Sequence, residues 1–409
     1  MGLPQMSSPD ELVQRTEAPL TSWKSVADYL GRGVRTVQRW HAESGLPISR
    51  VGSGRGTILA YRTDLDSWLR NSARPVSIQA SLADEQFAAL KHQTEVLSEA
   101  AAKMCNLLSE TNLSTIIQTF VKAAEICPTN PQAFAGIANI LVIEVLFGIV
   151  PLSVVHNQAQ AALTHALELQ PNALEVQLAS VWLNLISSRN LVEARRVLNE
   201  IAKTRPNYVL TQLGQGLVDI IDGRLDDALR HLEKASHLYP LASGVSALLC
   251  WTHYLSGAYE EAVVLARSAR ASGLDGVLLA ATETLASLQL DISCCSESLL
   301  KNQIARFPSG TLLRGVLAYY YGKTNRNDEA ENVCSAMLGE SQLEVGSRAY
   351  PIALAMIGLD KKREALEWLI NSVSEGDLWS LTLESDPVLA PLREDRQFQA
   401  ILGRLTLSA

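Results

Sequence analysis

The 409-residue sequence contains few of the residues on which metal sites, disulfide frameworks and nucleophilic catalysis depend. Its six cysteines form no CxxC pair and show no regular spacing with the seven histidines. We therefore expect no metal site and no disulfide framework, as is typical of a reducing compartment. The sequence also lacks a GxxxxGK[ST] loop, an HExxH pair and a nucleophile elbow, so we expect no enzyme and no cofactor.

A signal peptide is also missing, because the N-terminal stretch has no apolar core and no basic start. One apolar stretch, residues 137–155, is long enough to suggest a membrane span. Asn139 and Glu144 lie within it, however, and Gly148 and Pro151 interrupt it. We therefore expect a buried helix followed by a loop, no membrane contact and a cytoplasmic protein.

The net charge of −8 is unevenly distributed along the chain. Residues 21–74 contain nine basic and four acidic residues, whereas residues 75–409 contain 25 basic and 36 acidic residues. A small basic module joined to a large acidic one is typical of a nucleic-acid-binding head on a body that stays off the nucleic acid.

Residues 26–41, VADYLGRGVRTVQRWH, predict two short helices joined by a glycine turn. Helical spacing places Val26 and Leu30 on the buried face of the first helix, and Val37 and Trp40 on that of the second. The free face of the second helix is basic and amide-rich, which suits the major groove of DNA.

Residues 50–61 predict a β-hairpin with a glycine-rich, basic tip, and Thr63 can cap a short third helix. From Leu20 to Leu69 the sequence resembles the winged helix-turn-helix of the MerR and excisionase class. The resemblance rests on TSWKSVADYLGRGVRTVQRW, GLP at 45–47 and YRTDLDSWL. Gly33 stands where this class often has a serine N-cap, and glycine is an acceptable cap.

The resemblance implies that this module binds DNA. Arg35 and Gln38 are the expected base readers, since arginine and glutamine can contact G and A edges bidentately. A merely solvated helix face is the alternative interpretation. We expect Trp23, Trp40, Tyr61 and Trp68 to form a small core rather than stacking platforms. The full set of expected DNA contacts is Lys24, Arg35, Thr36, Gln38, Arg39, His41, Arg50 and Arg55.

A polar, proline-containing linker is predicted over residues 71–81, and a connecting helix over residues 82–111. Apolar residues in this helix alternate spacings of three and four, which is a heptad pattern. Either the helix packs on the body that follows it, or it forms a dimerising coiled coil.

From residue 112 onward the signal is a repeat. Ala194, Ala228, Ala262, Ser296 and Ala330 are each 34 residues apart, Ala365 follows after 35, and a proline lies 12 residues beyond several of them. A small residue is needed where two helices cross closely. The pattern resembles the tetratricopeptide repeat (TPR), a two-helix unit of 34 residues, and predicts about eight copies, with second helices near residues 116, 159, 194, 228, 262, 296, 330 and 365.

The TPR resemblance implies a concave face, lined by the first helices, that binds a protein or peptide partner. The expected groove residues are Gln177, Asn184, Gln212, Asp219 and His253. Two copies depart from the pattern. The period stretches to 43 between Ile116 and Ala159, and the copy at Ser296 lacks the usual glycine–alanine pair.

The final stretch, from ALEWL to Phe398, resembles the closing segment of bacterial TPR proteins fused to winged-helix, cyclase or kinase modules. Its carriers include Trp379, Asp386-Pro387 and Pro391-Leu392-Arg393. A terminal repeat must cover its last apolar face, so we expect this segment to cap the stack.

Together these patterns predict a mainly α protein, with a small winged helix-turn-helix followed by an α-solenoid. The predicted parts are residues 1–19 (N-terminus), 20–70 (DNA-binding domain), 71–81 (linker), 82–111 (connecting helix) and 112–409 (TPR superhelix). We interpret the chain as a cytoplasmic bacterial transcriptional regulator that binds double-stranded DNA and a protein partner. A homodimer is one of the assemblies that this interpretation allows. The alternative is a TPR interaction scaffold whose head does not bind DNA.

Overall fold

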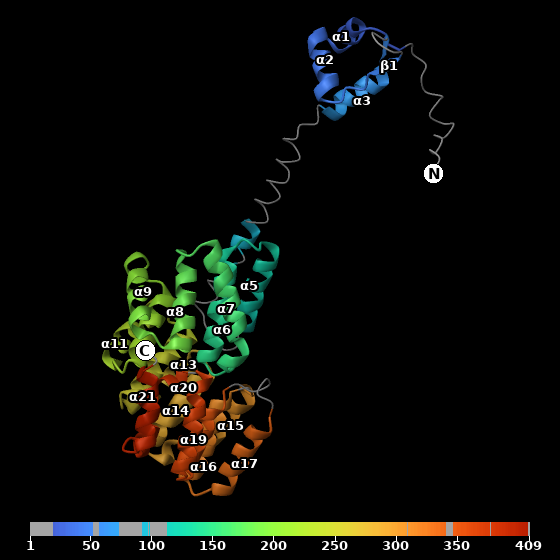
Figure 1. Cartoon of the computed structure of the whole chain (residues 1–409). Helices are drawn as coiled ribbons and strands as arrows, with labels where there is room; N and C mark the ends of the chain where they lie inside the picture. Colours follow the sequence, from blue (N-terminus) through green and yellow to red (C-terminus); the bar gives the residue numbers. More distant parts are fainter. Residues whose placement is uncertain are drawn as a thin grey trace. The chain divides into compact units, whose positions relative to one another are not determined.

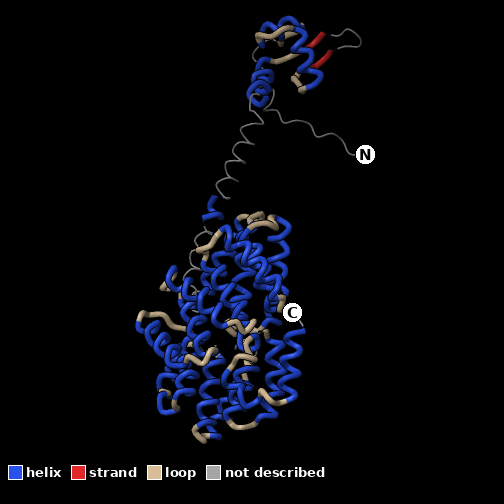
Figure 2. The backbone as a smooth tube through the Cα atoms, turned by 90° about the vertical axis from the view of Figure 1, so that its left-hand side faces the viewer, coloured by secondary structure: helices blue, strands red, loops and turns tan. Residues whose placement is uncertain are grey.

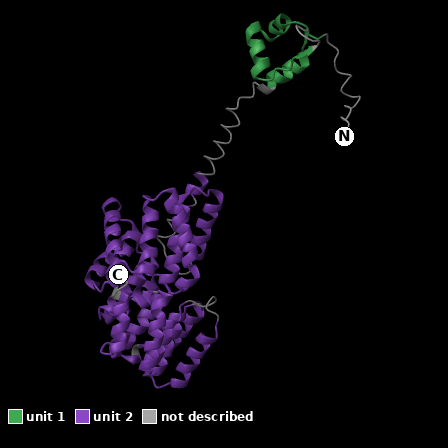
Figure 3. Cartoon of the chain, viewed as in Figure 1, with its two compact units in different colours: residues 1–89 green, residues 90–409 purple. Residues whose placement is uncertain are grey.

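The chain forms two compact units, residues 1–89 and residues 90–409 (Figure 3). Each unit has its own hydrophobic core. The first two residues of the predicted linker belong to a helix, whereas residues 73–81, most of the predicted connecting helix and all of its heptad residues except Thr94 lie outside the described residues. The computed structural model describes residues 19–51, 57–72, 92–96, 98, 113–308, 310–340, 347–376 and 378–407.

The N-terminal unit begins with two short helices, α1 (Trp23–Leu30) and α2 (Val34–Glu43). Ser22 and Ser25 form a capping box at the start of α1, in which each side chain accepts the other residue's backbone N–H at 3.1 Å. The helix ends at Gly31, whose φ of 61° costs glycine little. The chain therefore turns sharply into α2 within three residues.

A two-stranded antiparallel sheet and a third helix complete this unit (Figure 2). The strands are β1 (Ser49–Val51) and β2 (Thr57–Leu59), with Arg50 opposite Ile58, and the helix is α3 (Arg62–Ser72). The predicted hairpin tip, residues 52–56, lies outside the described residues.

The small core of this unit depends on tryptophans as well as aliphatic residues. Trp23, Trp40 and Trp68 pack against the buried cluster. The rings of Trp40 and Trp68 lie 5.5 Å apart, and the Trp68 indole donates a hydrogen bond of 3.1 Å to the Ser44 carbonyl. Their partial burial agrees with the core role expected for them. The buried members are Leu20, Val26, Ala27, Val37, Leu46, Ile48, Ile58, Ala60 and Leu65.

The second unit is a TPR-like solenoid of paired helices that stack side by side (Figure 1). Helix α5 (Leu113–Ile126) precedes the described pairs. These pairs are α6 (Pro131–Leu146) with α7 (Leu152–Leu169), α8 (Leu174–Ser188) with α9 (Leu191–Thr204), α10 (Val209–Ile221) with α11 (Leu225–Leu238), α12 (Ser243–Leu255) with α13 (Tyr259–Ala271), α14 (Val277–Leu290) with α15 (Glu297–Arg306), α16 (Thr311–Lys323) with α17 (Asn327–Gly339), and α18 (Ala349–Gly358) with α19 (Lys362–Glu375).

The repeat register follows the small residues found in the sequence. Gly223, with a φ of 71°, connects α10 to α11, and Ala228 on α11 is fully buried where the helices cross. Ala262 and Ala330 occupy the same place in α13 and α17 and are also fully buried. Each alanine is the fourth residue of its helix. Because each is fully buried, a larger side chain there would push the paired helices apart.

Ser296 departs from this register, and the structure corrects its predicted role. It is exposed and serves as the N-cap of α15, where its hydroxyl accepts the backbone N–H of Leu299 at 3.3 Å. A short 3-10 helix, η2 (Ile292–Cys294), takes the place of the first turn. Serine competes for backbone hydrogen bonds and favours a cap over a helix interior, so this second helix begins late.

Part of the predicted connecting helix is described, and it contacts the repeats. Residues 92–96 are helical and Thr94 is fully buried. Just beyond them, the Ser98 hydroxyl accepts a hydrogen bond of 3.1 Å from the side chain of Asn130, the N-cap of α6. At these positions the contacts favour packing on the body over a coiled coil.

The apolar stretch at residues 137–155 forms the end of α6, a loop and the start of α7. Asn139 within it is buried and donates a hydrogen bond of 3.4 Å to the Glu175 carbonyl. Within the described ranges, no helix combines the length and apolar character that a membrane crossing requires.

The C-terminal elements are α20 (Leu378–Leu381), η3 (Pro387–Leu392) and α21 (Arg396–Leu407). Helix α21 packs on α19, as a capping helix should. The preceding part does not stay at the end of the stack. Residues 378–392, hereafter the C-terminal segment, pack on α18 and α19 of the last pair, as expected of a cap, and also contact α12 and the end of α8 in distant repeats.

Candidate functional site

The exposed face of α2 is the first candidate surface. Arg35, Gln38 and Arg39 are exposed on it, and Lys24 on α1 and Arg50 on β1 are exposed as well. Among the described residues, none of these five side chains has a hydrogen-bond or ion-pair partner. The N-terminal unit therefore presents four cations and one amide whose binding capacity is unused.

Arginines of the repeat domain are bound differently. Ten of them form ion pairs with carboxylates of the same domain: Arg195, Arg196, Arg224, Arg230, Arg267, Arg270, Arg306, Arg314, Arg326 and Arg363. Their charge is largely neutralised within the fold. Lys24, Arg35, Arg39 and Arg50, by contrast, are available to an external anion.

Three other predicted DNA contacts are placed less favourably or are not described. Thr36 is half-buried. His41 is also half-buried, with its Nδ1 3.0 Å from the Leu46 carbonyl oxygen and its ring 5.6 Å from that of Trp23, so it supports the unit's own framework. Arg55 lies outside the described residues.

The inner face of the repeat domain, formed by the first helices, is occupied by the C-terminal segment. The Trp379 ring lies 5.7 Å from that of Trp251 on α12 and 6.5 Å from that of Tyr350 on α18. Arg189 at the end of α8 donates a hydrogen bond of 3.0 Å to the Leu381 carbonyl. Leu378, with residues of α6, α8, α10 and α12, lines an apolar cavity of about 40 Å³. The segment therefore contacts α12, α18 and the end of α8, and it lines a cavity together with α6 and α10.

The C-terminal segment is extensively buried. Seven of its apolar side chains are buried: Leu378, Trp379, Leu381, Leu383, Val388, Leu389 and Leu392. At about 1.5–3 kcal/mol for each, they contribute roughly 10–20 kcal/mol. The part of the inner face that the segment covers is therefore core, where we expected an open concave groove.

Asp386 fixes the middle of the C-terminal segment. Its buried carboxylate accepts hydrogen bonds from the hydroxyls of Tyr254, at 2.9 Å, and Tyr350, and from the backbone N–H of Val388 at 3.0 Å. Burial raises the pKa of the Asp386 carboxyl, and these hydrogen bonds oppose the rise. Three donors on one carboxylate make this part of the segment rigid.

The predicted groove residues share another face of the first helices. Gln177 and Gln212 are the fourth residues of α8 and α10, and Asn184 and Asp219 are the eleventh. Their surroundings are second helices: Asn184 lines a groove with α9, and Asp219 contacts α9 and α11. These side chains therefore point to the seams between second helices, not to the inner face.

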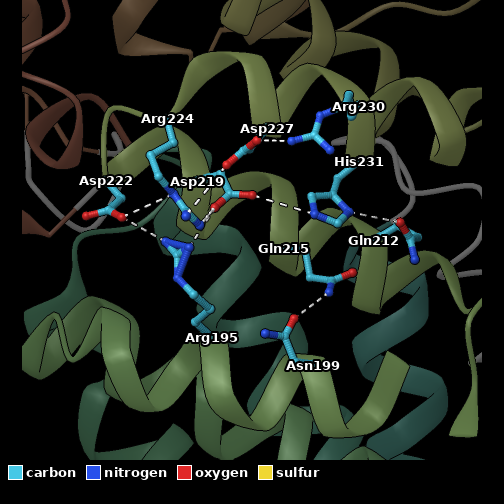
Figure 4. Close-up of polar contacts among 10 residues, drawn as sticks. All are labelled: Arg195, Asn199, Gln212, Gln215, Asp219, Asp222, Arg224, Asp227, Arg230 and His231. Atoms are coloured by element: carbon cyan, nitrogen blue, oxygen red, sulfur yellow. Dashed lines mark hydrogen bonds and ion pairs between the residues drawn. The ribbon is translucent and has the colours of Figure 1, made fainter. Parts of the chain in front are cut away.

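Asp219 is the centre of a closed polar network in the space between α9 and α11 beside α10, which we call the α10 seam (Figure 4). It is 4% exposed, and its carboxylate accepts hydrogen bonds from Arg195, at 2.9 Å, and Arg224. The Nε2 of His231 lies 3.7 Å from the same carboxylate, and its Nδ1 lies 3.3 Å from the Gln212 side-chain oxygen. Gln212 is 2% exposed, so neither Gln212 nor Asp219 is accessible to a partner.

Opposing effects set the ionisation of this network. Burial raises the pKa of the Asp219 carboxyl to about 6, while the charge of Arg195 acts to lower it. Burial and the neighbouring charge of Arg230 lower the pKa of the His231 imidazole. His231 is therefore neutral at physiological pH, and the two arginines supply the positive charge around Asp219.

The corresponding space beside Gln177 and Asn184 on α8, which we call the α8 seam, is open. It forms a groove of about 370 Å³, the α8–α9 groove, in which Gln177 and Asn184 lie together. Among the described residues, neither amide side chain has a hydrogen-bond partner. His253, the remaining predicted groove residue, is half-buried on α12, and burial lowers the pKa of its imidazole.

The sequence patterns missed the position of the C-terminal segment. Trp379 and Asp386 were visible as motif residues, but their partners lie about 130 residues earlier on α12. Within the described ranges, no group of three or more histidine, cysteine, aspartate or glutamate side chains is arranged to hold a metal ion.

No family model and no curated protein matches this sequence. The chain is similar to a chain of the APC/C hetero-tetramer Cut9-Hcn1, with 16% identity and a TM-score of 0.48 over 76% of this chain and 62% of that one. It is also similar to human IFIT1 in a dimer with m7Gppp-AAAA, with 13% identity and a TM-score of 0.37 over 94% and 82% of the two chains. The TPR domain of P58(IPK) matches with 14% identity and a TM-score of 0.20, over 77% and 98%.

These likenesses concern the fold alone. The chain spans less than two thirds of the Cut9-Hcn1 chain that it matches. The TPR-like character of the repeat domain rests on its own helical pairs and on their buried small residues at 34-residue spacing.

Proposed function

We propose that this protein is a DNA-binding regulator, in which the N-terminal unit is a winged helix that binds duplex DNA and the repeat domain binds a partner protein. One observation supports the DNA-binding part most directly: Arg35, Gln38 and Arg39 share the exposed face of α2 without partners in the described structure. Unneutralised cations on a short exposed helix suit a polyanion with a groove.

The chemistry of the other exposed cations agrees with this proposal. Lys24 and Arg50 flank α2 on neighbouring elements, where they can contact phosphates and orient the unit. Arg35 and Gln38 are one helical turn apart, so both can reach base edges in one major groove. A cytoplasmic location follows, since bacterial DNA lies there. No catalytic step belongs to the proposal.

The repeat domain is the partner-binding part. Stacked helical pairs present an extended surface, and partner binding there would alter the orientation or the dimerisation of the DNA-binding unit. The C-terminal segment covers the first helices that it contacts, so we assign the partner to the outer seams.

An interaction scaffold without a DNA role is the second candidate. The helical-repeat fold suits it as well, because such a fold is typical of protein interaction. The cations of the N-terminal unit separate the two candidates, since a unit that binds only protein has no need for four unneutralised charges.

Selection of random duplexes by the full chain across a salt series tests the proposal. We expect enrichment of a defined motif, with log K falling linearly with log salt by about 0.9 for each phosphate neutralised. The variant with Arg35→Ala and Arg39→Ala should lose this binding. Arg363→Ala serves as a matched control, because it removes an arginine that is 90% exposed on the repeat domain.

Absence of both an enriched motif and salt-sensitive binding would favour the scaffold. Equal binding by the double variant and by Arg363→Ala would show that any DNA contact lies elsewhere than on α2.

A further inference from the structure

Two neighbouring seams of the repeat domain have polar residues at the same helix positions but different surrounding side chains. Gln177 and Asn184 on α8 hold the positions that Gln212 and Asp219 hold on α10. The α10 seam is closed by side chains of the protein itself, whereas the α8 seam is open as a groove of about 370 Å³. The side chains that close the α10 seam therefore indicate which chemical groups the open α8 seam can bind.

Three residues close the α10 seam. Arg195, which follows the buried alanine of α9, donates to Asp219 at 2.9 Å. Arg224, the N-cap residue of α11, donates to the same carboxylate. His231, three residues after the buried alanine of α11, lies 3.3 Å from the side-chain oxygen of Gln212. Two guanidinium groups and an imidazole satisfy the polar residues of this first helix.

In the α8 seam each of these closing residues has a shorter or apolar counterpart. Gln160 follows the buried alanine of α7 and donates instead to Thr164 at 3.4 Å. Asn190 is the N-cap residue of α9, and its side chain accepts the Glu193 backbone N–H at 3.0 Å. Val197 stands three residues after the buried alanine of α9 and offers no hydrogen bond. The two amides of α8 are therefore left without the cations that complete the neighbouring seam.

We propose that the α8–α9 groove binds an extended segment of a partner protein that places an arginine side chain beside Asn184 and Glu193. This inference rests on the proposed partner binding by the repeat domain and specifies its surface and chemistry. The guanidinium lies where Arg195 and Arg224 meet Asp219 in the neighbouring seam, and Arg224 there also lies 3.6 Å from Asp227, the counterpart of Glu193. Arginine suits it better than lysine because its planar fork can bond both acceptors.

The charge of the groove agrees with a partner segment that carries an arginine. Glu193 is the one charged residue that lines the groove in the described structure, and residues 75–409 have an excess of 11 negative charges. Glu193 already pairs with Arg196 at 2.6 Å. Its counterpart Asp227 pairs with Arg230 and also lies 3.6 Å from Arg224, so one such carboxylate can serve two cations.

The groove runs along α8 from Gln177 to Ser188. Eleven residues of helix span about 16 Å, which matches about five residues of extended chain. Gln177, two helical turns from Asn184, can bond the backbone of such a segment through its amide.

Selection of a random 12-residue peptide library on the full chain tests the inference. We expect enriched peptides to share an arginine. Synthetic copies should bind about tenfold to a hundredfold more weakly when citrulline replaces that arginine, since citrulline keeps the shape but removes the charge. Asn184→Leu should cause a loss of similar size.

Gln160→Arg is the decisive variant. It restores the arginine of the neighbouring seam, so the protein's own guanidinium should fill the groove and abolish peptide binding. Residue 160 is exposed, and Gln160→Ala at the same position is the matched control, which should bind normally.

The outcomes separate this inference from the proposed function. Peptides that bind Gln160→Arg and Asn184→Leu as tightly as the original protein would place the partner elsewhere, and the groove assignment would fall while partner binding stood. A library without any enriched peptide would overturn both. Peptide binding that strengthens when Arg35 and Arg39 are replaced by alanine would identify the N-terminal unit as the occupant and overturn the assignment to a separate protein.

Discussion

The hydroxyl of Tyr254 donates a hydrogen bond of 2.9 Å to the carboxylate of Asp386, which lies 132 residues later in the chain. Both side chains are buried, and the bond joins α12 to the C-terminal segment. A solenoid normally has contacts only between neighbouring repeats. Here a segment from one end connects the inner faces of distant repeats, so the domain should unfold as one cooperative unit.

Replacement of Tyr254 by phenylalanine tests this connection. The ring remains, but the Asp386 carboxylate loses one of its donors in a buried site, which should cost about 1.5–3 kcal/mol in free energy of unfolding. Tyr239→Phe is the control, because its hydroxyl donates to the Asn207 carbonyl at an exposed site. Urea denaturation of both variants measures the difference. Equal losses would mean that the buried bond has no special weight.

The ionisation of Asp386 predicts a pH dependence of stability. Because burial raises its pKa in the folded protein, the folded state holds this proton more tightly than the unfolded chain does. The contribution of Asp386 is therefore full below the ordinary value of 3.8 and is lost as pH rises through the raised pKa. The stability of the original protein minus that of Asp386→Asn should fall as pH increases from acid to neutral. A difference that grows with pH would contradict the assignment.

Sequence periodicity predicted the second helices well, because a close helix crossing requires a small residue. Ala228, Ala262 and Ala330 are fully buried at such crossings. The same rule failed at Ser296, where local capping chemistry outweighed the period and the helix begins one turn late. A period indicates where a helix is needed, whereas the cap decides where it begins.

The sequence patterns did not predict the closed α10 seam or the contacts of the C-terminal segment with the inner face. Gln212 and Asp219 stand out as polar residues on apolar helices, and an open groove was the natural expectation. Their burial depends on Arg195 and His231 from two other helices. Contacts between distant residues, such as Trp251 with Trp379, leave no periodic trace in the sequence.

Helices α16 and α18 are in backbone contact, which predicts a strong effect of one methyl group. A Cβ added at Gly322 would lie 2.4 Å from the carbonyl carbon of Gly358, where no flexible side chain can move aside. Gly322→Ala should therefore cost roughly 2–4 kcal/mol in free energy of unfolding. Gly339→Ala on α17 is the control: nothing lies within 4 Å of its added Cβ, and the change should be neutral or slightly stabilising. Thermal denaturation distinguishes them, and equal melting temperatures would argue against the tight α16–α18 contact.

The proposed DNA interface predicts different consequences for Gln38 and Arg50. Gln38 is exposed on α2, where an amide can read a base edge, so Gln38→Ala should reduce discrimination at one base pair by about 1–3 kcal/mol. Arg50 is exposed on β1 and is expected to contact a phosphate, so Arg50→Ala should weaken binding equally to all sequences and reduce the salt slope by about one. Titration of the full chain with the selected duplex and its single-base variants, across a salt series, measures both quantities. A changed site ranking in Arg50→Ala would show that the strand, and not only α2, reads sequence. An unchanged ranking in Gln38→Ala would leave base recognition to Arg35, its neighbour one turn earlier on the same exposed face.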